Sequence, residues 1–260
     1  MNTMLLKKKL LMVSLTLVGA FSSSLCLAHP GEESRITIEL ENQGNFKAGM
    51  IPFAFQVFDS ETQKTLSDKD LVETHTKILH MIAYDPSRNE FNHVHPSFDG
   101  KLWSTELNLA FNGSYFVWAQ GQLADGTEFS TYAKANIVDG KPSLQILSLG
   151  ENRKATDRLT TLELDKTKIK AGKSVMINFK VTREDGQKPK MAPYLGALAH
   201  VIAVSPDGDE LIHVHPMAGS GPNTGMIHAT FPTEGDYRLW VQFIEHDELK
   251  TIPLSVVVTK

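Results

Sequence analysis

Short segments in which hydrophobic and polar residues alternate run along most of the chain, and they predict β-strands. Clear examples are PFAFQVF (52–58), VMINFKV (175–181) and YRLWVQF (237–243), which are rich in β-branched and aromatic residues. Gly, Pro, Asp and Asn separate such segments, as they do between the strands of small β-proteins. No amphipathic helical pattern follows residue 28, so we expect an all-β chain.

The chain contains two copies of one unit. LHMIAYDPSRNEFNHVHP (79–96) aligns without a gap with AHVIAVSPDGDELIHVHP (199–216), and GSYFVWAQ (113–120) aligns with GDYRLWVQ (235–242). About seven strands in roughly 100 residues are typical of an immunoglobulin-like sandwich, in which we expect the equivalent Trp118 and Trp240 to be core residues. Two tandem immunoglobulin-like β-sandwich domains are therefore predicted, with these bounds: domain 1, 33–139; linker, 140–157; domain 2, 158–260.

Residues 1–28 have the layout of a secretory signal peptide. A basic start precedes an apolar run that is shorter than the ~20 residues needed to span a bilayer, and small residues stand at Cys26 and Ala28. We expect cleavage after Ala28, a periplasmic or secreted protein and no membrane span in the mature chain. An uncleaved anchor or lipidation at Cys26 are the alternatives, and both would tether the same body.

Charge and cysteine content limit the possible partners and metal ligands. The 260 residues carry 26 basic and 30 acidic side chains, a net charge of −4, and loss of residues 1–28 removes three lysines and changes it to −7. Such a chain lacks the basic field that nucleic acid requires. The mature chain also lacks cysteine, so any metal site must use imidazole, carboxylate or thioether.

Six of the ten histidines occupy matching positions in the two copies. They form one set per domain, with the same spacing of thirteen and then two residues: His80, His93, His95 and His200, His213, His215. Residues two apart in a strand point to the same face, so the last two of each set lie side by side.

The third histidine of each set is expected on the partner strand of a hairpin. In the second copy, a turn centred between Asp207 and Gly208 places His200 opposite His215 and Ile202 opposite His213. Three imidazoles then share one face, close enough for their nitrogens to lie ~2 Å from one ion. The first copy has a longer loop with the same centre, which pairs His80 with His95.

These sets predict metal sites, with a hydrogen-bonded structural role for the histidines as the alternative. Three imidazoles suit copper or zinc, and the general affinity order favours copper. Because neutral imidazole is the ligand, metal is expected to leave as the pH falls below ~6.5. Three further residues are weaker candidates: His75, which would support or cap a site without binding the ion; Met217, a fourth ligand near His215; and His29, which with its free amine could chelate Cu(II).

Motifs of hydrolases, P-loop proteins and dinucleotide-binding enzymes are absent from the mature sequence, so we do not expect an enzyme. The blocks HTKILHMIAYDPSRNEFNHVHP and APYLGALAHVIAVSPDGDELIHVHP resemble those of exported bacterial YtkA-like and related secreted immunoglobulin-like domains. The resemblance implies an exported sandwich, with copper handling suspected for some relatives. It matches His75 in the first copy with Leu195 in the second. Similarity to copper-resistance proteins of the CopC type is looser and transfers no residue.

These observations predict a periplasmic or secreted protein that binds copper, or else zinc, for buffering, delivery or resistance. Its expected partners are the metal ion and a metal exporter or another periplasmic protein. The alternative is a non-enzymatic adhesion or assembly module in which the histidines are structural.

Overall fold

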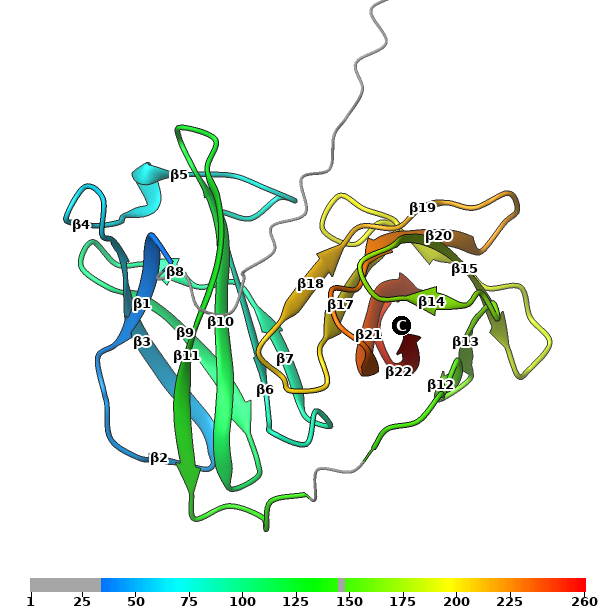
Figure 1. Cartoon of the computed structure of the whole chain (residues 1–260), viewed down its shortest axis with the longest axis horizontal. Helices are drawn as coiled ribbons and strands as arrows, with labels where there is room; N and C mark the ends of the chain where they lie inside the picture. Colours follow the sequence, from blue (N-terminus) through cyan, green and yellow to red (C-terminus); the bar gives the residue numbers. More distant parts are fainter. Residues whose placement is uncertain (1–33, 145–147) are drawn as a thin grey trace, which may run out of the picture.

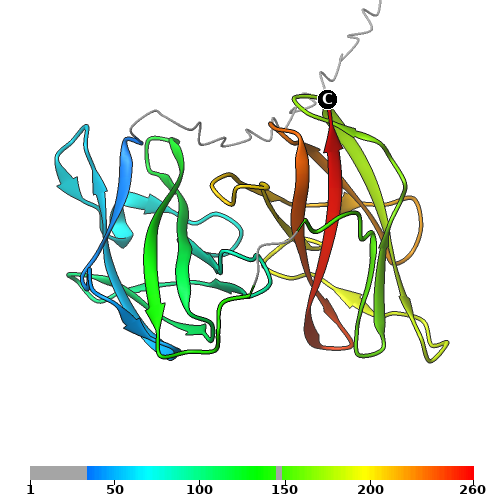
Figure 2. The ribbon, with the colours of Figure 1, turned by 60° about the horizontal axis from the view of Figure 1, so that its bottom comes forward.

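The computed structural model describes residues 34–144 and 148–260, and nearly all of its regular structure is β (Figure 1). The predicted signal peptide (1–28) and His29 lie outside the described residues. The two copies of the repeat form two sandwiches that lie side by side (Figure 2). This is the all-β, immunoglobulin-like architecture that the alternating pattern predicted. Within the described residues, no helix is long and apolar enough to cross a membrane.

The first sandwich consists of two largely antiparallel sheets. One has the strand order β1-β3-β9-β8, with β4 beside β3, and the other has the order β2-β11-β10-β6-β7, with β5 beside β10. The elements are β1 (Ile36–Leu40), β2 (Phe46–Lys47), β3 (Gly49–Asp59), β4 (Lys64–Thr65), the 3-10 turn η1 (Asp68–Asp70), β5 (Leu71–Val72), β6 (Leu79–Tyr84), β7 (Phe91–Val94), β8 (Ser97–Phe98), β9 (Trp103–Leu109), β10 (Gly113–Leu123) and β11 (Glu128–Val138).

The second sandwich repeats this plan. Its sheets have the orders β12-β13-β15-β20-β19 and β14-β22-β21-β17-β18, with β16 beside β21. The strands are β12 (Lys154–Asp157), β13 (Thr160–Leu164), β14 (Ile169–Lys170), β15 (Ser174–Arg183), β16 (Met191–Ala192), β17 (His200–Val204), β18 (Leu211–Val214), β19 (Met217–Ala218), β20 (Thr224–Thr230), β21 (Gly235–Glu245) and β22 (Glu248–Thr259). The linker predicted at 140–157 is therefore too long, because its last four residues pair with β13 as an edge strand.

Each sandwich has its own hydrophobic core between its two sheets. Strand β3 shows how the sequence builds it: Phe53, Phe55 and Val57 are buried at every second position, and polar or smaller residues between them face outward. Removing such side chains from water supplies the main stabilisation of each domain.

A third hydrophobic cluster lies between the domains. The whole of β6 and the whole of β17 are buried, one face inside the sandwich and the other against the neighbouring domain. The cluster between the domains contains Ile82, Tyr84, Phe116, Trp118, Ile202, Val204, Leu211 and Trp240. Trp118 and Trp240 are thus buried, as expected, but the prediction that they belong to the core of each sandwich is wrong, because their side chains point from the outer face of the sheet into the interface.

Polar contacts fix the two domains at the hairpin turns. The Tyr84 hydroxyl donates to Gly208 O at 2.6 Å and accepts from Trp118 Nε1 at 2.7 Å. Gly208 has φ of 81°, and a Cβ at this position would lie 3.2 Å from the Phe116 ring, so the close approach favours glycine. Arg88 donates across the interface to the carbonyl oxygen of Ser205 at 2.9 Å.

Candidate metal centre

Both histidine hairpins have the register that the turn predicted. In the second domain Ile202 pairs with His213, and in the first Ile82 pairs with His93. The same registers, extended by two residues, set His200 opposite His215 and His80 opposite His95. Because side chains alternate along β6 and β17, the first histidine of each set lies on the outer face of its sheet, which faces the other domain.

The structure brings the histidines together in two triads. We call them the first triad (His80, His93, His95) and the second triad (His200, His213, His215). In each triad, three ring nitrogens, one per residue, lie within 4.8 Å of one another. Both groups have an arrangement that can hold a metal ion.

The distances within the second triad match those expected around a tetrahedral ion. Nitrogens bound about 2.0 Å from one ion lie about 3.3 Å apart, and the centroids of their rings lie about 5 Å apart. The Nδ1 atom of His200 lies 3.1 Å from His213 Nε2 and 3.0 Å from His215 Nε2. The three ring centroids are 4.4 to 5.4 Å apart.

The first triad has nearly the same geometry. His80 Nδ1 lies 3.2 Å from His93 Nε2, and the ring centroids are 5.0 to 5.5 Å apart. His95 differs from His215, because its Nε2 is buried and has no hydrogen-bond partner among the described residues. A buried imidazole nitrogen without a partner costs free energy, which binding of a cation would recover.

Hydrogen bonds on the far side of the rings determine which nitrogen carries the proton. His80 Nε2 lies 3.2 Å from the carbonyl oxygen of Thr74, and His200 Nε2 lies 3.0 Å from that of Tyr194. A carbonyl can only accept, so Nε2 is the donor in both rings and Nδ1 has a free lone pair. These lone pairs point into the triads, as in histidines that bind a metal through one nitrogen and donate from the other.

The second histidine of each triad is held by a glutamine of the other domain. His93 Nδ1 donates to Gln242 Oε1 at 2.7 Å, and His213 Nδ1 donates to Gln120 Oε1 at 3.1 Å. The Gln242 amide donates in turn to Thr251 Oγ1 at 3.1 Å, which fixes its oxygen toward the histidine. The Nε2 atoms of His93 and His213 are therefore unprotonated when the rings are neutral, and they face the lone pairs of His80 and His200.

Burial keeps the rings neutral near pH 7. Desolvation is the largest cause in each case: it lowers the pKa of His95 and His200 to about 4 and that of His93 to about 3. The pKa values of His213 and His215 are lowered as well, with neighbouring histidines adding to the effect. Neutral imidazole is the form that ligates metal, so the release expected below pH 6.5 moves to lower pH.

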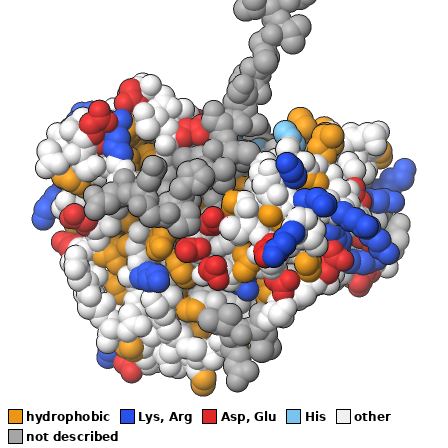
Figure 3. Space-filling view, in the orientation of Figure 1, with side chains coloured by type: hydrophobic (Ala, Val, Ile, Leu, Met, Phe, Trp, Pro, Cys, Tyr) orange, Lys and Arg blue, Asp and Glu red, His pale blue; other side chains and the backbone are white. Residues whose placement is uncertain are grey.

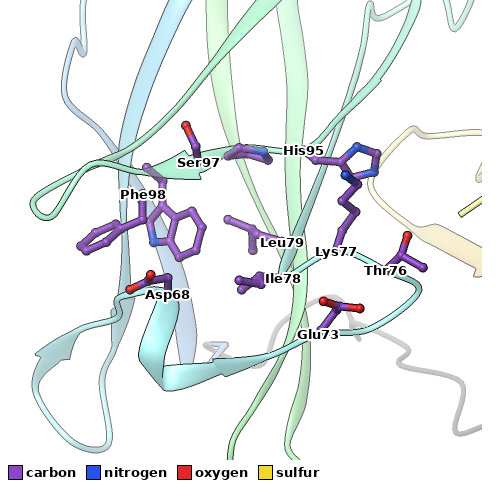
Figure 4. Close-up of a pocket in the computed structure, with 11 residues that line it drawn as sticks. Asp68, Glu73, Thr76, Lys77, Ile78, Leu79, His95, Ser97 and Phe98 are labelled. Atoms are coloured by element: carbon purple, nitrogen blue, oxygen red, sulfur yellow. The ribbon is translucent and has the colours of Figure 1, made fainter.

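A cavity of about 370 Å³ lies beside the first triad. Figure 4 shows His95 at one side of it, with the Lys77 side chain extending toward the ring and Asp68 on the opposite side. Glu73 also lines the cavity, from the turn that precedes β6. The first triad thus adjoins a cavity lined by two carboxylates and by the Lys77 ammonium, which lies beside His95.

His75 contacts the second triad, although it belongs to the first domain. It lies in a tight turn with φ of 51°, so it does not follow the alternation of β6, and this explains why strand periodicity did not place it. Its ring centroid is 3.5 Å from that of His215, which is too close for both rings to bind one ion at the expected spacing of about 5 Å. His75 therefore packs on His215 as a cover, and Leu195 occupies the equivalent turn position in the second domain.

Met217 does not join the second triad as predicted. It lies in β19, which pairs with β20 in the opposite sheet of the second sandwich, and its side chain is half exposed. The prediction assumed that the strand continues through Pro216, but β18 ends at Val214 and the chain crosses to the other sheet.

The triads lie mostly inside the protein. On the face seen in Figure 3, a small area of histidine surface appears on the second domain beside hydrophobic side chains. His80 and His200 are 2% and 0% exposed, and the other four histidines of the triads are partly buried.

Comparisons with known proteins add little about function. Residues 154–260 match the model of a domain family of unknown function, DUF8832. No curated protein matches the chain.

Several solved structures are similar to the chain, at low whole-chain scores. Fibronectin(III)-like modules of Clostridium thermocellum CbhA are 12% identical, with 85% of this chain and 93% of that chain covered and a TM-score of 0.24. A tetra-tandem repeat of a large adhesion protein is 12% identical, with coverage of 86% and 48% and a TM-score of 0.28. The Escherichia coli adhesin FdeC is 12% identical, with coverage of 91% and 66% and a TM-score of 0.26. The chain spans about half of the adhesion-protein structure and just under two thirds of the FdeC structure.

Proposed function

We propose that this protein is an exported metal-binding protein that holds one copper ion, or else one zinc ion, at the histidine triad of each domain. The observation that carries the proposal is the convergence of unprotonated nitrogens. In each triad, the facing nitrogens of the first two histidines carry lone pairs, because their opposite nitrogens donate to fixed oxygens. These facing nitrogens lie 3.2 Å apart in the first triad and 3.1 Å apart in the second. A purely structural histidine cluster would be expected to pair a donor with each acceptor.

The ligand set favours copper among the common ions. Imidazole nitrogen binds both Cu and Zn, and the affinity order places Cu(II) above Zn(II) at such a site. With the resemblance to exported YtkA-like domains and the signal-peptide layout, the proposed role is copper buffering, delivery or resistance outside the cytoplasm. A metal exporter or another periplasmic protein would be the partner.

Metal stoichiometry of the mature chain tests the proposal. At pH 7.5 we expect two equivalents of copper per chain, and one equivalent after His93→Ala with His95→Ala or after His213→Ala with His215→Ala. His228→Ala is the matched control, because this exposed histidine of β20 lies outside both triads, and it should leave two equivalents.

Thermal stability gives an independent measurement. A ligand at 100 times its dissociation constant adds about 2.7 kcal/mol per site, which raises the melting temperature visibly. If the parent chain binds neither copper nor zinc, and neither ion raises its melting temperature, the metal-binding function is wrong. The alternative of an adhesion or assembly module then gains support.

A further inference from the structure

The two triads lie next to each other across the domain interface. The His80 ring centroid is 5.6 Å from that of His213, which is nearly the same as its 5.5 Å separation from His93 in its own triad. The His93 ring is 5.8 Å from His213 and 6.2 Å from His200. Four rings, two from each domain, thus form one packed group.

The repeat makes the cross-domain contacts reciprocal. Gln120 and Gln242 occupy equivalent positions in the repeat, and each accepts a hydrogen bond from the second histidine of the opposite triad. Within its own sheet, each glutamine lies on the strand next to a histidine of its own triad: Gln120 pairs with His80, and Gln242 pairs with the first histidine of the second triad. Each glutamine therefore adjoins one triad and orients a ring of the other.

From these contacts we infer that the two ions form one paired centre across the domain interface, in which Gln120 positions the second-domain site and Gln242 positions the first-domain site. This inference rests on the proposed function. It goes beyond it by making each site depend on the domain that supplies none of its ring ligands.

The ring positions limit the distance between the two ions. An ion about 2 Å from a ligating nitrogen lies about 3 Å from the centroid of that ring. With His80 and His213 centroids 5.6 Å apart, the ions are separated by no more than about 12 Å. Two Cu(II) ions at this distance interact magnetically through space.

The coupling has a simple physical origin. An ion bound in one triad fixes the orientation of the histidine rings. The Nδ1–H of the second histidine then donates a stronger hydrogen bond to the glutamine of the other domain. Each bound ion thus strengthens a contact that docks the domains and orients the other site, and this effect opposes the Coulomb repulsion between the two cations. Outer hydrogen-bond partners of this kind change metal affinity by about 10- to 100-fold when they are removed.

The decisive experiment measures each site alone, with the full-length mature chain and Cu(II). The variant His93→Ala with His95→Ala keeps the second site, and His213→Ala with His215→Ala keeps the first. In the chain that keeps the second site, Gln120→Leu should weaken copper binding about 10- to 100-fold and Gln242→Leu should have little effect. In the chain that keeps the first site, the two leucine variants should have the opposite effects.

Conservative variants separate positioning from damage to the fold. Gln120→Glu and Gln242→Glu keep an oxygen that accepts from the histidine, so they should retain the affinity of the parent. Gln122→Leu, two residues along β10, is the control for loss of a partly buried amide whose bond stays within its own domain. Circular dichroism and urea unfolding of the metal-free variants would show whether a sandwich has unfolded.

The possible outcomes point in different directions. If each leucine variant weakens the site of its own domain, or neither weakens any site, the paired centre is wrong although the metal-binding function survives. If the parent itself binds no copper, the proposed function fails.

Electron paramagnetic resonance tests the pairing of the two ions independently of the glutamine variants. The parent loaded with two Cu(II) ions should show dipolar broadening, and each single-site chain should show the narrower spectrum of one isolated ion. A two-copper spectrum equal to the sum of the two single-site spectra would overturn the pairing.

Discussion

Lowering the pH should destabilise the metal-free protein well before its carboxylates are protonated. The cause is the set of buried neutral histidines in the two triads, because burial holds their pKa values below the ~6.5 of an unfolded chain. The pKa is about 4 for His95 and His200 and about 3 for His93. Below pH 6.5 the unfolded chain takes up protons that the folded chain does not, so the free energy of unfolding decreases as the pH falls.

The magnitude follows from proton linkage. Each such group contributes about 1.4 kcal/mol per pH unit between the unfolded and the folded pKa. At pH 5.5, one unit below the unfolded value, these three histidines together lower the free energy of unfolding by roughly 4 kcal/mol relative to pH 7.5. This is a large part of the ~5–15 kcal/mol that stabilises a typical domain.

Urea unfolding of chelator-treated protein at pH 7.5, 6.5 and 5.5 measures the effect. The double variant His93→Gln with His95→Gln should show a shallower pH dependence, since it removes two of the buried histidines whose pKa values are lowered. His228→Ala is the matched control for loss of a histidine, because this exposed residue of β20 lies outside both triads. An equal free energy of unfolding at pH 7.5 and 5.5 in the parent would refute the reasoning.

Three further predictions concern the interface and the sites. Trp240→Ala should cost about 3–5 kcal/mol in urea unfolding, because this ring is 2% exposed between the domains, whereas Leu249→Ala at a side chain 45% exposed should cost far less. Tyr84→Phe should cost about 1–3 kcal/mol by the same assay, since it leaves the Gly208 carbonyl and an indole N–H without their partner; an unchanged midpoint would contradict this. Met217→Leu should leave copper affinity unchanged in a competition titration, because β19 belongs to the sheet opposite the second triad, and a marked loss would show that the thioether is a ligand after all.

Much of the local geometry could be predicted from the sequence, because it depends on short-range rules. The Asp207-Gly208 turn sets the register of its hairpin, and the two-residue period places His213 and His215 on one face. Export, metal identity and physiological partner stay predictions, since the structure does not test them.

The relation between the domains could not be predicted in the same way. A strand that is buried on both faces has the same apolar composition whether its second face meets its own sandwich or a neighbour, so Trp118 gave no sign of lying between the domains. The sequence indication of the interface was the segment LHMIAY (79–84), which has apolar residues on both faces. A strand with one face in water would alternate with polar residues, and the structure buries every residue of this strand. The role of Gln120 required knowledge of the docked arrangement, since its partner is 93 residues away.

The reciprocal glutamine contacts have a consequence for how such a centre can be assembled. In an isologous dimer, a residue of each subunit makes the same contact with the partner subunit. This two-fold symmetry is the commonest among protein assemblies. Here the covalent connection joins the two halves, so the encounter of separate subunits is replaced by folding of a single chain. Having both halves in one polypeptide also permits a difference that identical subunits cannot have: one half carries His75 and the other carries Leu195.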